Sequence, residues 1–337
     1  DDSIDRSLSS KARIETADEF TNADTLAWVV SFDEDMDPST INPEDFQVRT
    51  TEAVGYTVLA STITVTPAPA FEGDSATYRV EATGGDLTDF NGTVQLGLVG
   101  GATSFADMAG NADDHTADSD SDGDLATNQT YTLDNGAAVP TVSLSSDTGV
   151  AGDGITSSGG LSVTGTESGS TLEYSTDPSA GWHSDQAGLS LAEGENTVYV
   201  RQIDLVGNVS DPASITFTLD TTGPGAASVA RFDGETGVDS DGVVDFTVTL
   251  SEPVDPTTFS TADLAVTGAS GAVTVEPQTG AATDTFKVSV PYDADAGSSV
   301  SVAIAAGADF ADVAGNLGGL GSSMVDTDGD GIDELVY

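Results

Sequence analysis

The stretch LAWVVSFDEDMDPST at residues 26–40 returns as VDFTVTLSEPVDPTT at residues 244–258. The two copies lie 218 residues apart, and the same offset aligns residues 13–48 with residues 231–266 without a gap. The offset also places Trp28 on Phe246, Val30 on Val248 and Glu34 on Glu252. A module that recurs with different sequence between its copies is typical of a tandem array, and arrays usually span distance or multiply weak contacts.

Short alternating runs of apolar and polar residues, separated by Gly, Asp, Asn and Pro, indicate β-strands throughout the chain. The chain has 337 residues, of which 37% are hydrophobic and 38 are Gly, and no long segment shows apolar residues at helical spacing. Strand signals recur at intervals of roughly 8–12 residues, which favours two-sheet sandwiches. The sequence therefore predicts an all-β protein made of three tandem immunoglobulin-like (Ig-like) β-sandwiches in an elongated arrangement.

Two similar seams set the predicted domain boundaries. Residues 130–134 (TYTLD) are followed by Pro140, and residues 216–220 (TFTLD) by Pro224. Each seam, the segment in which one predicted domain passes into the next, has the pattern of a strand that ends in an acidic residue and is followed by a short linker. We expect domain 1 at residues 1–134, domain 2 at 135–220, and domain 3, a repeat of domain 1, at 221–337.

Charge is the second dominant property of the chain. Asp and Glu total 57 against 8 Lys and Arg, which gives a formal net charge of −49. Binding to nucleic acid requires basic groups that displace counterions, so nucleic acid is excluded as a partner. Clustered carboxylates repel one another by roughly 1–4 kcal/mol per close pair. Either bound divalent cations or a very salty medium must offset this repulsion.

Several familiar chemistries are missing from the sequence. There is no Cys, so disulfides and thiol chemistry are excluded. No run of about 18 apolar residues is present, and the amino terminus lacks a basic region followed by an apolar one. We therefore expect no direct membrane insertion and a mature or excised piece of something longer. His183 stands beside Trp182, but His183, Ser184 and Asp185 are consecutive and cannot form the geometry of a triad, so we expect no catalytic residues.

One loop motif, Asp-x-x-Gly-Asn, occurs in all three predicted domains. Its oxygen-bearing residues are Asp107 and Asn111, Asp204 and Asn208, and Asp312 and Asn316. In an immunoglobulin sandwich this position is the F–G loop, at the end where the preceding domain attaches. Oxygen ligands and a glycine turn suit Ca²⁺, while an Asx-stabilised turn without metal is the alternative.

Two acidic runs resemble the first half of an EF-hand loop. Alternate acids closed by Gly occur at Asp118, Asp120 and Asp122, and again at Asp326, Asp328 and Asp330, the second followed by Asp333 and Glu334. Neither run has Glu at the twelfth position, where Gln129 and Tyr337 stand. We expect calcium at both runs, with a solvated acidic hairpin as the alternative.

The seams are expected to collect further calcium ligands. Immunoglobulin topology brings the A–B loop, with Asp147 and Asp153, toward Asp220 and the F–G loop of domain 3. By the same reasoning, Asp134 should meet the loop of Asp204 and Asn208. Aligning the two acidic runs also indicates that domain 3 lacks most of its last strand, which trimming or a strand from a neighbouring subunit would explain.

The middle domain carries the motifs DGIT at residues 153–156, EGENTV at 193–198 and DLVGN at 204–208. It resembles the bacterial Ig-like repeats of large repetitive calcium-binding surface adhesins of the RTX/Bap type. Domains 1 and 3, with TNADTLAW at 21–28 and FADMAGN at 105–111, resemble a sister group from the same kind of protein. The resemblance implies secretion, a bacterial cell-surface location, biofilm adhesion and several calcium ions.

Together these features predict a non-catalytic, calcium-rigidified extender segment of a secreted bacterial adhesin. Its expected partners are neighbouring repeats of the same chain and, in addition, a cell surface, a glycan or identical subunits. Two alternatives stay open: a subunit of a self-assembling surface layer or filament, and a carbohydrate- or protein-binding head in which Trp182 is exposed beside calcium. High-salt adaptation is a further explanation of the acidity.

Overall fold

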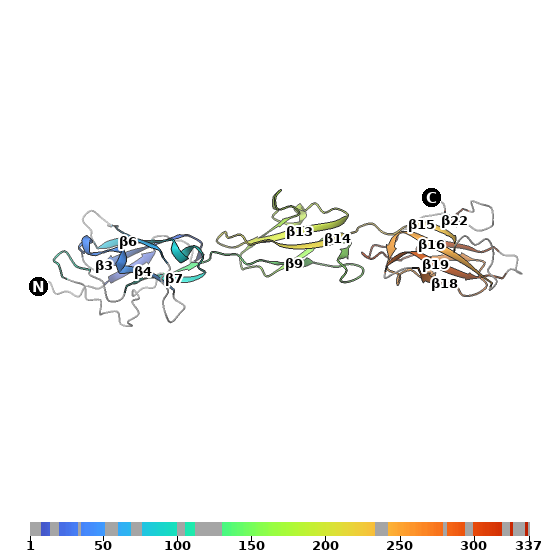
Figure 1. Ribbon diagram of the computed structural model, residues 1–337, viewed down its shortest axis with the longest axis horizontal. Helices are drawn as coiled ribbons and strands as arrows, with labels where there is room; N and C mark the ends of the chain where they lie inside the picture. Colours follow the sequence, from blue (N-terminus) through green and yellow to red (C-terminus); the bar gives the residue numbers. More distant parts are fainter. Residues whose placement is uncertain are drawn as a thin grey trace. The chain divides into compact units, whose positions relative to one another are not determined.

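The computed structural model describes residues 8–13, 20–32, 35–50, 60–68, 76–99, 105–111, 130–232, 242–278, 282–293, 299–318, 324–325 and 334–335. Within these ranges the chain is all-β and contains no α-helix (Figure 1). The predicted fold class is confirmed in this respect. The helical segments in these ranges are short 3-10 turns: η1 (Pro38–Thr40), η2 (Pro43–Asp45), η3 (Gly85–Thr88), η5 (Gln186–Gly188) and η7 (Thr261–Asp263).

The chain divides into two compact units. The first comprises Asp1–Val139, Thr166–Thr171 and Arg201–Asp211, and the second comprises Pro140–Gly165, Leu172–Val200 and Pro212–Tyr337. The boundaries expected at Asp134 and Asp220 stay a prediction.

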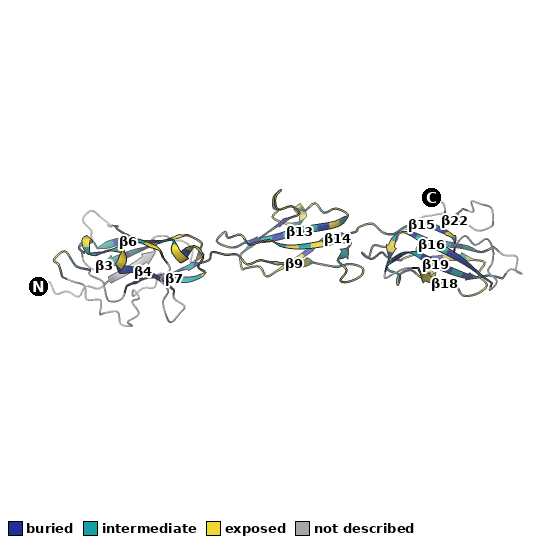
Figure 2. Ribbon diagram, viewed as in Figure 1, coloured by how far each residue is buried: buried dark blue, intermediate teal, exposed yellow. Residues whose placement is uncertain are grey.

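The first unit contains two four-stranded sheets, ordered β1-β3-β6-β5 and β2-β8-β7-β4. Their strands are β1 (Leu8–Arg13), β2 (Phe20–Thr21), β3 (Thr25–Phe32), β4 (Phe46–Thr50), β5 (Thr62–Pro67), β6 (Thr77–Thr83), β7 (Gly92–Leu98) and β8 (Thr130–Leu133). Alternate residues of β3 are buried, as the pattern predicted (Figure 2). The Trp28 and Tyr131 rings, one from each sheet, meet edge to face at 5.2 Å, and the Tyr131 hydroxyl donates to the carbonyl of Ala27 at 2.7 Å. One apolar core therefore joins the two sheets of a sandwich.

The second unit contains two hydrophobic clusters. The cluster that includes Val198, Val200 and Phe217 belongs to the sheets β10-β14-β13-β12 and β11-β9. Their strands are β9 (Thr141–Leu144), β10 (Ile155–Thr156), β11 (Leu161–Thr164), β12 (Thr171–Ser175), β13 (Gly194–Ile203) and β14 (Ala213–Leu219).

The other cluster, around Phe246, Phe286 and Phe310, lies between the sheets β15-β16-β19-β18 and β17-β20. The strands of these two sheets are β15 (Ala226–Arg231), β16 (Val243–Val254), β17 (Leu264–Thr267), β18 (Thr274–Pro277), β19 (Thr283–Pro291) and β20 (Ser301–Ile304). β21 (Met324–Val325) and β22 (Glu334–Leu335) pair with each other in a separate two-stranded sheet.

The sequence repeat extends to the hydrogen-bond register. Leu8 pairs with Phe32 and a bulge follows before Ser10, while Ala226 pairs with Leu250 and a bulge follows before Ser228. Both pairs and both bulges are separated by the same 218 positions as the sequence copies. In the first copy, β7 pairs with both β4 and β8. In the second copy, β20 pairs only with β17 among the strands that the structure describes.

Candidate metal centre

Each of the three Asp-x-x-Gly-Asn loops has the same pattern of internal hydrogen bonds. In the loop at residues 312–316, the Asp312 carboxylate accepts from the Asn316 backbone N–H at 2.8 Å and from the Asn316 amide at 2.9 Å. The Asp312 N–H donates to the Asn316 carbonyl at 3.1 Å. Gly315 has φ +85°, a left-handed conformation that glycine adopts without strain.

The other two loops repeat this arrangement. Asp107 accepts from the Asn111 N–H at 2.7 Å and from its amide at 2.6 Å, and Asp204 accepts from the same groups of Asn208 at 2.8 and 2.6 Å. The motif is therefore a self-contained turn in which the aspartate is held by its own loop, as the alternative reading of an Asx-type turn requires. A cation site needs oxygen atoms from outside the loop.

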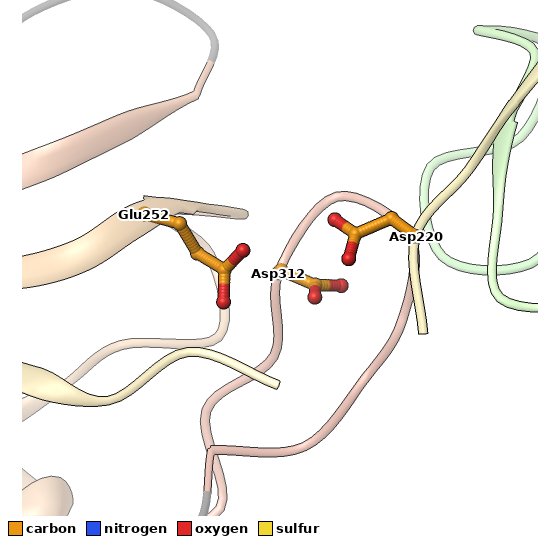
Figure 3. Close-up of side chains that lie close together, drawn as sticks. All are labelled: Asp220, Glu252 and Asp312. Carbon is orange, nitrogen blue, oxygen red and sulfur yellow. The ribbon is translucent and has the colours of Figure 1, made fainter. Parts of the chain in front are cut away.

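The loop at residues 312–316 has such atoms within reach. One carboxylate oxygen each from Asp220, Glu252 and Asp312 can be chosen so that all three lie within 4.8 Å of one another. Figure 3 shows the three carboxyl groups directed toward one another, with Asp312 between the other two. Asp312 is 1% exposed, and Asp220 and Glu252 are half-buried.

Three different backbone features position these side chains. Asp220 directly follows β14, and its carbonyl accepts from the Asn316 amide at 2.8 Å. Glu252 lies on β16, in the irregular section between Thr249 and Val254. Val254 then forms an isolated bridge with Asp312, which brings the end of β16 beside the loop.

The electrostatics of the cluster favour a positive charge at its centre. The pKa of Glu252 is raised, first because burial penalises its charged form and then because Asp220, Asp312 and Glu193 are negative. At an effective dielectric of 20, two charges about 4.8 Å apart repel by about 3 kcal/mol. The attraction of a bound cation would offset both the burial penalty and the mutual repulsion of the carboxylates.

The oxygen spacing also fits a hard divalent cation. Ca²⁺ binds six to eight oxygens at about 2.3–2.6 Å, so two ligands of one ion lie no more than about 5 Å apart. The spacing of the three carboxylates falls within that limit. Asp220, Glu252 and Asp312 would hold the ion as charged ligands, leaving further positions to water.

The sequence-derived set contained Asp220, Asp312 and Asn316 but not Glu252. The Asn316 amide nitrogen is occupied by the Asp220 carbonyl and the Asp312 carboxylate, so Asn316 joins the two segments by hydrogen bonds. The repeat alignment held a signal for Glu252, since the offset of 218 residues places Glu34 on Glu252.

The second loop joins other segments without gathering carboxylates. The Asn208 amide donates to the carbonyl of Asp134 at 2.6 Å, and the Asn22 amide donates to the Asn208 side-chain oxygen at 3.1 Å. Within the described residues no group of three carboxylates forms around Asp134 and Asp204.

The turn that contains Asp147 and Asp153 lies against the loop at residues 312–316, as immunoglobulin topology indicated. The Val150 N–H donates to the Val313 carbonyl at 2.9 Å, and the Thr148 hydroxyl donates to the Ala314 carbonyl at 2.6 Å. The two aspartates cap their own turn: Asp147 accepts from the Gly152 N–H at 2.7 Å, and Asp153 accepts from the Ile155 N–H at 2.9 Å.

The remaining predicted ligands belong to the acidic runs. Asp118, Asp120, Asp122, Asp326, Asp328, Asp330 and Asp333 lie outside the described residues. Glu334 lies in β22, which is described by its backbone only. Calcium at the two runs stays a prediction. In the part of the chain that the structure describes, no helix has the length and apolarity needed to cross a membrane.

The solved structures that are similar to this chain include S-layer proteins. One is the crystal structure of the N-terminal part of the bacterial S-layer protein SbsC, 12% identical, with a TM-score of 0.23, covering 64% of this chain and 44% of that one. Another is the S-layer protein rSbsC(31-844), also 12% identical with a TM-score of 0.23, covering 99% of this chain and 62% of that one. This chain therefore spans less than two thirds of either.

A further similar structure is that of the Clostridium thermocellum CbhA fibronectin(III)-like modules, 14% identical, with a TM-score of 0.23, covering 63% of this chain and 95% of that one. A search of curated proteins gave no match. At the level of sequence families, residues 13–106 match the bacterial Ig-like domain, which confirms the Ig-like character of the first copy of the repeat.

Proposed function

We propose that this chain is a spacer segment of a secreted bacterial surface adhesin, in which calcium stiffens the joints between Ig-like sandwiches. The match of residues 13–106 to a bacterial Ig-like domain supports the class of protein. The cluster of Asp220, Glu252 and Asp312 carries the calcium part of the proposal. A spacer requires no catalytic residues.

The position of the cluster explains how an ion would act mechanically. Asp220 is the first residue after strand β14 of one sandwich. Glu252 and Asp312 belong to segments around the hydrophobic core of the next sandwich. An ion held by all three would link the linker that starts at Asp220 to the following sandwich. Without the ion, mutual repulsion of the carboxylates opposes the contact that the Asn316 amide makes with Asp220.

We expect calcium to raise the melting temperature of the full chain at fixed ionic strength. A ligand present at a hundredfold excess over its dissociation constant adds about 2.7 kcal/mol to the stability of the state that binds it. For domains of this size that corresponds to roughly 10–20 °C. Differential scanning calorimetry in chelator, in calcium and in sodium chloride of equal ionic strength measures the effect.

Two results would count against this function. A melting temperature that is the same in chelator and in calcium would show that calcium does not stabilise the chain. An equal gain from sodium chloride would attribute the acidity to high-salt adaptation. Small-angle scattering on the same samples adds an independent readout, because stiffened joints should increase the radius of gyration in calcium.

A further inference from the structure

The two copies of the repeat carry the same loop in two different environments. Ala314, in the loop at residues 312–316, is 0% exposed. Ala109, at the same place in the loop at residues 107–111, is exposed, and its neighbour Met108 is 69% exposed. Their glycines nevertheless have nearly the same backbone conformation, with φ +85° at Gly315 and +83° at Gly110.

Among the described residues, a turn covers the loop at residues 312–316 and no turn covers the loop at residues 107–111, which accounts for the difference in exposure. Residues 148–150 (Thr-Gly-Val) reach the carbonyls of Val313 and Ala314 through the Val150 N–H and the Thr148 hydroxyl. Gly149 lies between these two donors and packs so closely that a Cβ atom on it would be 2.1 Å from the Val313 carbonyl oxygen. The turn is therefore shaped to this loop, and only glycine fits at its centre.

The loop at residues 107–111 presents the same backbone surface, and no turn from the described part of the chain lies on it. Met108 and Ala109 occupy the positions of Val313 and Ala314, whose carbonyls receive the two hydrogen bonds. A Cβ atom on Gly110 would meet nothing within 4 Å among the described residues, whereas one on Gly315 would be 2.9 Å from the Gly149 nitrogen.

The loop at residues 204–208 is a poorer match to this surface. Val206 stands where the other two loops have Ala, so a branched side chain replaces the methyl group that the turn covers. Its Asn208 is also engaged with Asn22 and with the carbonyl of Asp134.

We propose that the loop at residues 107–111 is a docking surface for a Thr-Gly turn carried by another Ig-like sandwich. The partner is defined by its chemistry: a hydroxyl donor and a backbone N–H donor on either side of a glycine, as in Thr148–Val150. Docking would bury Ala109 and part of Met108, as it buries Ala314. This inference rests on the comparison of the two loops and not on calcium.

The test uses the full chain labelled with ¹³C at its methionine methyl groups. The probe is a cyclic peptide of residues 145–160, whose ends can be joined because the Ser145 N–H donates to the Gly160 carbonyl at 2.9 Å. Met108 is exposed and Met36 is 1% exposed, so Met36 serves as an internal reference. The Met108 signal is assigned with the variant Met108→Leu.

We expect the peptide to shift the Met108 methyl signal in a saturable manner and to leave Met36 unchanged. We expect half of the full shift at about 1 mM peptide, the dissociation constant of a weak complex. The same peptide with Gly149→Val should give no shift, because the added side chain would collide with the loop carbonyl. Absence of a Met108 shift up to about 5 mM native peptide, or an equal shift from the Gly149→Val peptide, would overturn the proposal.

Discussion

Replacing Glu252 with Gln is expected to stabilise the chain in chelator and to destabilise it in calcium. In chelator the substitution removes a carboxylate whose pKa is raised by burial and by the charges of Asp220, Asp312 and Glu193. We expect a gain of about 1 kcal/mol, the size of one close like-charge contact in water. In calcium the variant loses a charged ligand and with it most of the stabilisation of about 2.7 kcal/mol.

The pH dependence follows from the same raised pKa of Glu252. A carboxyl group with a folded-state pKa above its unfolded value gives stability that is fully present below the unfolded pKa and is lost as pH rises through the folded pKa. The ion-free chain should therefore gain stability from this group on acidification. Calcium requires the ionised group, so its stabilising effect should weaken over the same pH range.

Calorimetric melting of the native and variant chains, in chelator and in calcium, measures whether Glu252→Gln stabilises the chain in the first medium and destabilises it in the second. The matched control is Glu276→Gln, which removes an equal charge from an exposed position on β18 of the same unit. This control should respond equally in the two media. If Glu252→Gln behaves like Glu276→Gln, the cluster does not bind calcium.

Replacing Gly149 with Ala is expected to detach the turn at residues 148–150 from the loop at residues 312–316. Gly149 has φ +74°, where a non-glycine residue costs roughly 1–2 kcal/mol, and its new Cβ would lie 2.1 Å from the Val313 carbonyl oxygen. Relieving an overlap of this kind costs typically 1–3 kcal/mol. The sum, about 2–5 kcal/mol, exceeds the value of the two hydrogen bonds that hold the turn, each about 1 kcal/mol.

Hydrogen exchange of the Val150 amide reports on this contact, because its N–H donates to the Val313 carbonyl. We expect exchange at Val150 to accelerate by at least about tenfold in Gly149→Ala, which corresponds to about 1.4 kcal/mol. Gly152→Ala is the matched control, since Gly152 lies in the same turn with φ +89° but its Cβ would meet nothing within 4 Å. Equal acceleration in the two variants would show that backbone strain, and not the contact with Val313, governs exchange.

The sequence predicts the strands and the repeat well because both depend on local patterns. Trp28 and Phe246 stand at matching points of alternating runs, and both are buried in the cores of their sandwiches. The pattern also places Asp220 and the turn around Asp147 at one end of the middle sandwich, facing the loop of Asp312 in the following sandwich, since connections between strands fix which loops share an end.

The composition of the candidate centre could not be predicted in the same way. Glu252 joins it because β16 loses regular pairing after Thr249 and because Val254 bridges to Asp312, and neither feature has a local sequence signal. The roles of Asn316 and Asp147 also depend on three-dimensional contacts. Asn316 donates to two segments, and Asp147 caps its own turn through Gly152, whereas composition alone treats every oxygen-bearing side chain as a ligand.

Anomalous diffraction from crystals of the full chain grown with calcium, with terbium exchanged as a stronger scatterer, would locate an ion bound by the three carboxylates. We expect a difference peak about 2.3–2.6 Å from oxygens of Asp220, Glu252 and Asp312. A map that shows these three side chains ordered and close together, with only water between them at saturating calcium, would contradict this expectation.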